Sequence, residues 1–129
     1  MAGTAYDLLL TKQDVSCFAG TELASWLEER GVDTLTVTGF MTQHCDESTS
    51  RDAADLGLAV ELLSDAAGSP PLTTPAGSLT AQEVHERSLV VLGAGFVSVT
   101  TTAAWIAAVR AGEALPGPNL WASTAPARD

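Results

Sequence analysis

The residue best placed for chemistry is Cys45, which lies near the start of a helix-like segment. A β-branched run at residues 34–38 ends at Gly39, and a helical pattern then continues to Leu56. A cysteine in the first turn of a helix faces unpaired backbone N–H groups and the positive end of the helix dipole, which favour thiolate over thiol. This position predicts a nucleophilic cysteine. The alternative is a buried helix cysteine with no reactive role.

A lysine is expected beside this thiol. Residues 6–11 form an apolar run that predicts a buried strand ending at Lys12. Ligands of an open α/β sheet collect at the carboxyl ends of its strands, so Lys12 and Cys45 should lie on the same rim. An ammonium group there stabilises a thiolate and helps to orient an acid–base partner. The alternative for Lys12 is a solvated lysine at a strand end.

The other cysteine and the two histidines give weaker signals. Cys17 is interpreted as a small buried side chain beside Phe18. A redox pair with Cys45, the less favoured alternative, would need their Cα atoms within about 7 Å. His44 neighbours the thiol but points about 100° round the helix, so a structural role and a substrate contact are both open. His85 is expected to pack or to lie on the surface. Cys45, His44 and His85 lack the spacing of a zinc cluster, so no metal site is predicted.

Strand and helix patterns alternate along the chain. Strands are predicted at residues 6–11, 34–38, 58–63 and 96–99, and helices at residues 21–31, 40–56, 80–92 and 102–110. Thr21 is an expected N-cap, Thr80 is the expected start of a helix, and Gly57 is an expected C-cap. Residues 64–66 should turn the chain into a loop that holds Pro70, Pro71 and Pro75. Such alternation implies parallel strands and right-handed crossovers, so the predicted class is α/β.

Length and composition limit the kind of protein further. A chain of 129 residues with 46% hydrophobic residues suits one domain, which we place at residues 1–111, with a flexible tail at 112–129. No apolar run reaches the roughly 18 residues that a membrane span needs, and no secretory leader is evident, so a cytoplasmic protein is expected. The formal charge of −10 makes nucleic acid an improbable partner.

The motifs around Lys12 and Cys45 resemble those of the isochorismatase-like cysteine hydrolases, which include the nicotinamidase-related amidohydrolases. The resemblance covers about residues 5–105. It rests on Lys12, on the stretch 16–23, on Gly39, Thr42, Cys45, Thr49 and Ala53, and downstream on Gly57, the run 64–66, His85, Leu89, Leu92 and Phe96.

This resemblance implies a Rossmann-like three-layer α/β/α fold with a mainly parallel sheet. It makes Cys45 the nucleophile and Lys12 its cationic partner, with the backbone amides of Met41 and Cys45 as the oxyanion site and a cis peptide at Phe40-Met41. Loops around Phe18 and His44 would contact the substrate. The implied reaction cleaves the C–N bond of a small amide through a thioester on Cys45, without a cofactor, in a homo-oligomer. Isochorismatase proper is disfavoured, because it hydrolyses a vinyl ether and does not need this thiol.

The sequence departs from the family pattern in two places. The family's catalytic aspartate ends a strand upstream of the lysine, and the chain begins too late to contain that strand, so we expect a fold truncated at the N-terminus. Asp7 would lie about 16 Å from the rim and should not replace it. Asp46 follows the cysteine where a small apolar residue is usual, and with Glu47 it should oppose thiolate formation. The alternative function is therefore a catalytically impaired homologue or fragment that acts as an interaction or structural subunit.

Overall fold

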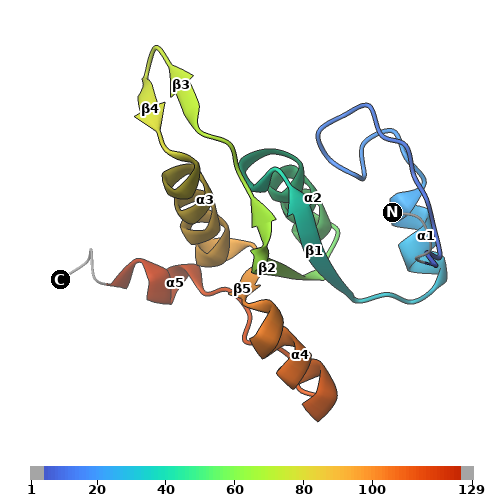
Figure 1. The fold of residues 1–129 in the computed structure, drawn as a ribbon. Coiled ribbons are helices and arrows are strands. Elements are labelled where there is room, and N and C mark those ends of the chain that lie inside the picture. Colours follow the sequence, from blue (N-terminus) through green and yellow to red (C-terminus); the bar gives the residue numbers. More distant parts are fainter. Residues whose placement is uncertain (1–4, 126–129) are drawn as a thin grey trace.

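The computed structural model describes residues 5–125, in which strands alternate with helices (Figure 1). The strands are β1 (Thr34–Phe40), β2 (Ala59–Gly68), β3 (Leu72–Thr74), β4 (Gly77–Leu79) and β5 (Ser98–Thr100). The helices are α1 (Leu23–Glu29), the π-helical turn η1 (Thr42–Asp46), α2 (Glu47–Asp55), α3 (Ala81–Gly95), α4 (Thr102–Ala111) and α5 (Leu120–Ser123).

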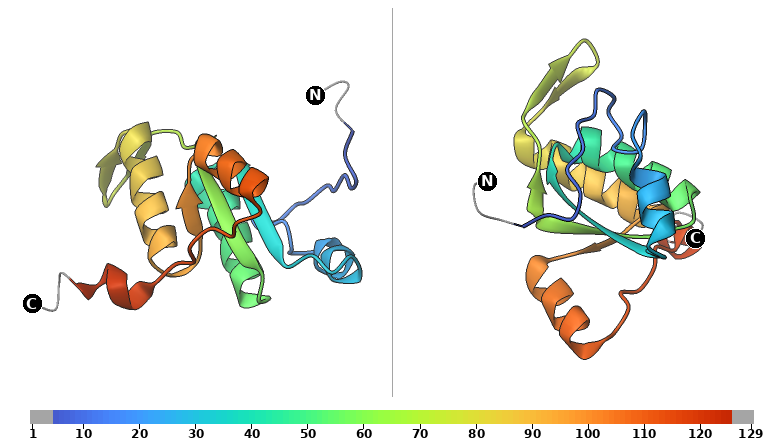
Figure 2. Two further views of the ribbon diagram at one scale, coloured as in Figure 1. Left: turned by 90° about the horizontal axis from the view of Figure 1, so that it is seen from below. Right: turned by 90° about the vertical axis from the view of Figure 1, so that its right-hand side faces the viewer.

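Strands β1, β2 and β5 form a parallel sheet with β2 at its centre. Val37 of β1 lies beside Leu62 of β2, and both are buried in a core that also takes residues from α2 and α3. Side chains alternate along a strand, so Glu61 points to the opposite face, where it accepts a hydrogen bond from Trp105 of α4. Helices therefore cover both faces of the sheet (Figure 2), and the predicted α/β class with a mainly parallel sheet is confirmed.

Several element ends fall where local sequence signals predict them. Thr80 caps α3 through a capping box, in which its hydroxyl accepts from the Glu83 amide and the Glu83 carboxylate accepts from the Thr80 amide. Gly57 follows α2 with a φ of 86°, a conformation that favours glycine after a helix. These signals are local, which explains why the sequence alone reveals them.

The predicted strand at residues 6–11 is wrong. This segment runs beside the body without joining the sheet, and Tyr6 and Leu9 are 68% and 72% exposed. A strand needs a neighbour that pairs with its backbone N–H and C=O groups. Within the described residues, β1 pairs only with β2, so the apolar run at 6–11 has no ladder to join.

Strand β2 is longer than predicted, because residues 64–66 continue it to Gly68 instead of starting a loop. A register shift between Val37 and Gly39 lets β1 pair with β2 again, with Phe40 opposite Gly68. A Cβ at Gly68 would lie 2.9 Å from Cε2 of the Phe40 ring, so glycine lets this ring lie directly over the strand, and a larger residue would push the exposed ring aside. The extension depends on this distant pairing.

The remaining differences lie after Gly68. The predicted proline-rich loop contains the antiparallel hairpin β3–β4, which projects from the body (Figures 1 and 2). Helix α3 continues to Gly95, and a Cβ at Gly93 would lie 3.1 Å from Cγ2 of Val99, so this glycine allows close packing on β5. Strand β5 begins at Ser98, two residues later than predicted.

The segment at 112–129, predicted to be a flexible tail, contains α5, and its residues 126–129 lie outside the described part of the chain. Of the helices that the structure describes, none has the length and apolar character needed to cross a membrane.

Candidate functional site

The turn that carries Cys45 begins where β1 ends. The Phe40-Met41 peptide is cis, as the resemblance implies, and η1 starts at the next residue. The Met41 carbonyl accepts hydrogen bonds from the amides of His44 (2.9 Å) and Asp46 (3.3 Å). These bonds fold the chain tightly back on itself. Cys45 is thereby placed at the junction between the carboxyl end of β1 and the start of α2, as the sequence predicts.

Lys12 lies in contact with the thiol. Its Nζ is 3.3 Å from Sγ of Cys45, and it also donates to the carbonyl oxygens of Asp14 (2.9 Å) and Val15 (3.1 Å). An ammonium group has three donors, and each has an acceptor here. The loop after Lys12 therefore aims the side chain at Cys45, although the strand expected to deliver it does not form.

The following loop is fastened to α2 one turn beyond Cys45. The backbone amide of Cys17 donates to Oγ1 of Thr49 (3.0 Å), and the Thr21 hydroxyl donates to the Cys17 carbonyl. Cys17 itself is a half-buried free thiol, as is Cys45. Thr49 lies four residues after Cys45, so the loop and Cys45 share one side of the helix.

The two residues predicted to contact substrate lie in different surroundings. His44 is exposed next to Cys45, so its side chain is not part of the core. Phe18 packs against the buried core and lines a groove with Leu27 of α1 and Leu56. A substrate contact stays a prediction for both residues.

His85 takes part in the structure of this turn, a connection that sequence analysis missed. Its Nδ1 is 2.8 Å from Oγ1 of Thr42, the first residue of η1, and its Nε2 is 2.9 Å from the carbonyl oxygen of Ser64 on β2. No sequence signal points to this link, because Thr42 and His85 are 43 positions apart.

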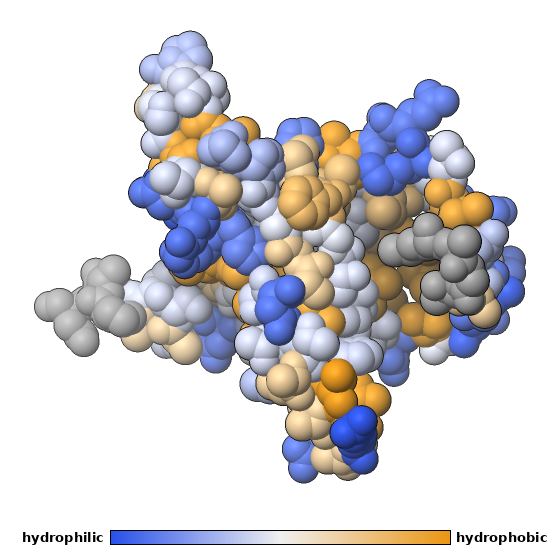
Figure 3. Space-filling view, in the orientation of Figure 1, coloured by the Kyte–Doolittle hydropathy of each residue, from blue (hydrophilic) through white to orange (hydrophobic). Residues whose placement is uncertain are grey.

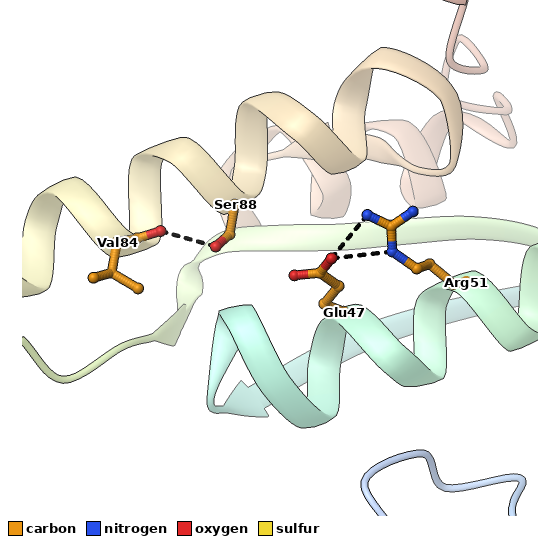
Figure 4. Close-up of polar contacts among 4 residues, drawn as sticks. All are labelled: Glu47, Arg51, Val84 and Ser88. Atoms are coloured by element: carbon orange, nitrogen blue, oxygen red, sulfur yellow. Dashed lines mark hydrogen bonds and ion pairs between the residues drawn. The ribbon is translucent and has the colours of Figure 1, made fainter. Parts of the chain in front are cut away.

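The sequence predicts that Asp46 and Glu47 both oppose thiolate formation. The structure places the two side chains in different surroundings. Asp46 is only 5% exposed, and burial raises the pKa of its carboxyl group while the charge of His85 lowers it. Glu47 pairs with Arg51 at 2.8 Å on α2, on the side that faces α3 (Figure 4). The guanidinium of Arg51 also lies over the Phe96 ring. One carboxyl group is thus buried and the other has a cation beside it.

Metal ligands do not gather in the described residues: nowhere between residues 5 and 125 do three or more His, Cys, Asp or Glu side chains lie together so that they could hold an ion.

Comparison with known proteins supports the fold and shows the family. A sequence model of the isochorismatase domain matches residues 1–104. The chain belongs to the isochorismatase family. The crystal structure of a candidate isochorismatase from Burkholderia xenovorans LB400 is 50% identical, with a TM-score of 0.86, over 91% of this chain and 56% of that one. A cysteine hydrolase from Pseudomonas syringae pv. phaseolicola 1448A is 35% identical, with a TM-score of 0.75, over 78% of this chain and 47% of that one.

A shorter match is to a nicotinamidase/pyrazinamidase. The nicotinamidase/pyrazinamidase of Mycobacterium tuberculosis is 48% identical over 46 residues, which are 36% of this chain and 25% of that protein. The isochorismatase-family chain spans about half the length of the first curated relatives it matches, 52% and 56% of their residues.

Proposed function

We propose that this isochorismatase-family chain carries the nucleophile of a cysteine hydrolase that cleaves the C–N bond of a small amide. The observation that carries the proposal is the 3.3 Å contact between Lys12 Nζ and Cys45 Sγ at the start of a helix. The match to a nicotinamidase/pyrazinamidase supports an amide as the substrate class. The substrate would be a small molecule, and the active protein a homo-oligomer in the cytoplasm.

The proposed reaction proceeds through a thioester. The Cys45 thiolate attacks the amide carbonyl carbon, an S–C bond forms, and the C=O electron pair moves to oxygen, where the amides of Met41 and Cys45 receive the charge. The pair returns, the C–N bond breaks, and the nitrogen leaves with the proton that the thiol gave up. Water then adds to the thioester, the S–C bond breaks, the carboxylic acid is released with one proton of the water, and the other proton returns to the Cys45 sulfur.

Lys12 is assigned the role of stabilising this thiolate. Its two carbonyl contacts hold the ammonium group in place, so the charge is present before substrate arrives. The proton of the thiol must be held by an acid–base group during the reaction. Within residues 5–125, Lys12 forms no ion pair with a carboxylate. That observation favours the second candidate function, an impaired homologue or fragment that acts as an interaction subunit.

Alkylation of Cys45 by iodoacetamide, measured by mass spectrometry in a Cys17→Ser background, distinguishes the cysteine hydrolase from the interaction subunit. In the active form, Lys12→Met should slow alkylation at pH 7 about tenfold, because a charge-assisted hydrogen bond to the thiolate is lost. Gln13→Met, a change at the exposed neighbouring position, is the matched control and should leave the rate unchanged.

Equal rates for the Lys12 variant and its parent would contradict the proposed role of Lys12 and favour the interaction subunit. A fast, Lys12-dependent thiol would justify assays of ammonia release from small aromatic and aliphatic amides. No release from any amide would then contradict the proposed substrate class.

A further inference from the structure

The hydrogen bonds of His85 fix which ring nitrogen carries the proton. Nε2 lies 2.9 Å from the Ser64 carbonyl oxygen, which can only accept, so Nε2 bears the hydrogen. In the neutral ring Nδ1 then has the lone pair. The Thr42 hydroxyl, 2.8 Å away, is therefore the donor to Nδ1. His85 thus connects α3 to both β2 and η1 through one defined tautomer.

Thr42 links its hydrogen bond with His85 to the position of Cys45. Its side chain is completely buried, and it is the first residue of η1, directly after Met41 and three residues before Cys45. A buried hydroxyl that loses its partner carries the full cost of its desolvation, so the pair with His85 favours one orientation of the turn. Moving Thr42 would move the Met41 amide and Cys45 with it.

A neighbouring carboxyl group leaves this pairing undisturbed. Asp46 lies on the same buried side of the turn, and its Oδ2 has no hydrogen-bond partner among the described residues. Thr42 nevertheless pairs with the imidazole, so the ring is the group that holds the start of η1.

We propose that His85 is a positioning residue, which holds the turn from Met41 to Cys45 against the end of β2 through the Thr42 hydroxyl and so keeps Cys45 aligned with Lys12. The inference rests on the proposed function, since it takes Cys45 as the nucleophile. It adds a residue on α3 that neither touches the thiol nor contacts substrate in the proposed reaction.

The test compares Thr42→Val with Thr42→Ser in the full chain, in the Cys17→Ser background. Valine keeps the shape and removes the donor, whereas serine keeps the donor. Alkylation of Cys45 at pH 7 should be about fivefold slower for Thr42→Val and close to the parental rate for Thr42→Ser, because one buried hydrogen bond is at stake. His85→Gln, which retains an amide N–H for the Ser64 carbonyl but has no acceptor in place of Nδ1, should match Thr42→Val.

The double variant Thr42→Val/His85→Gln decides whether the two residues act through one bond. We expect it to react no more slowly than either single variant, because both remove the same interaction. A general loss of folding is detected separately by the melting temperature, and His85→Gln serves if Thr42→Val does not fold.

The outcomes distinguish this inference from the proposed function. If the parental Cys45 reacts no faster than a free thiol in a short peptide, the proposed function fails and the positioning role fails with it. If the parental Cys45 is fast and depends on Lys12, but Thr42→Val and Thr42→Ser react at equal rates or the double variant multiplies the single effects, only the positioning role of His85 is overturned.

Discussion

Asp46 follows Cys45 directly, yet its carboxyl group points into the protein, towards Gly39 of β1. Burial favours the neutral form of this group, so its pKa is raised in the folded state above the ordinary value of 3.8. The unfolded chain ionises more readily than the folded chain, and stability is therefore lost as the pH rises through the folded-state pKa. At pH 7 this residue opposes folding.

Asp46→Asn should accordingly raise the melting temperature at pH 7, because the buried position no longer has to hold an ionisable group. The gain should shrink as the pH falls from the raised pKa towards the ordinary value of 3.8, and it should vanish below that value, where both states of the parent carry a neutral carboxyl group. Thermal unfolding at pH 7 and pH 4 measures this, with Asp55→Asn at an exposed position on the adjoining helix α2 as the control. A gain of equal size at both pH values would contradict the assigned cause.

At the scale of single elements, α3 depends on its first turn. Thr80 and Glu83 satisfy each other's backbone amides, and these hydrogen bonds lower the pKa of Glu83. Thr80→Ala should cost about 1 kcal/mol of unfolding free energy. Thr80→Ser, which keeps the hydroxyl, should cost little. Urea denaturation gives both values, and equal losses for alanine and serine would show that the hydroxyl does not act as a cap.

Elements specified by adjacent residues could be predicted, and those specified by distant partners could not. Three features depend on neighbouring residues in the chain: Gly31, which follows α1 with a positive φ, the Thr80 cap of α3, and the strand-to-helix junction at Cys45. The extension of β2 instead depends on the re-pairing of Gly68 with Phe40, and the apolar run at 6–11 lacks a partner strand among the described residues. The link between Thr42 and His85 joins residues 43 positions apart, and no pattern within either segment reveals it.

At the scale of the whole molecule, α4 forms its own layer and has no buried residue. Ile106 and Val109 are exposed, and Figure 3 shows hydrophobic surface over this helix. Side-chain hydrogen bonds join α4 to β2 at two points: Trp105 Nε1 donates to Glu61 (2.7 Å), which also accepts from Thr36, and the Thr102 hydroxyl donates to Asp65 (2.8 Å). We infer that α4 opens more readily than the core helices.

Trp105→Phe keeps the aromatic ring area in part and removes this donor, so the amides of α4 should exchange hydrogen about fivefold faster. Hydrogen–deuterium exchange read by mass spectrometry resolves α4 from the sheet. Trp26→Phe on α1 is the matched tryptophan control and should leave α4 unaffected. Faster exchange throughout the chain would indicate global destabilisation instead of local release of α4.

Lys12 is the only lysine in the chain, and all three of its N–H groups are engaged by two carbonyls and the Cys45 sulfur. Amine-acylating reagents can therefore modify only one lysine side chain in this chain, and that lysine contacts Cys45. Peptide mapping distinguishes its modification from that of the α-amino group. Acylation there requires the ammonium group to lose its proton and leave these acceptors. The mass of one peptide can therefore record how often the lysine–thiol pair is open, without any substrate being known.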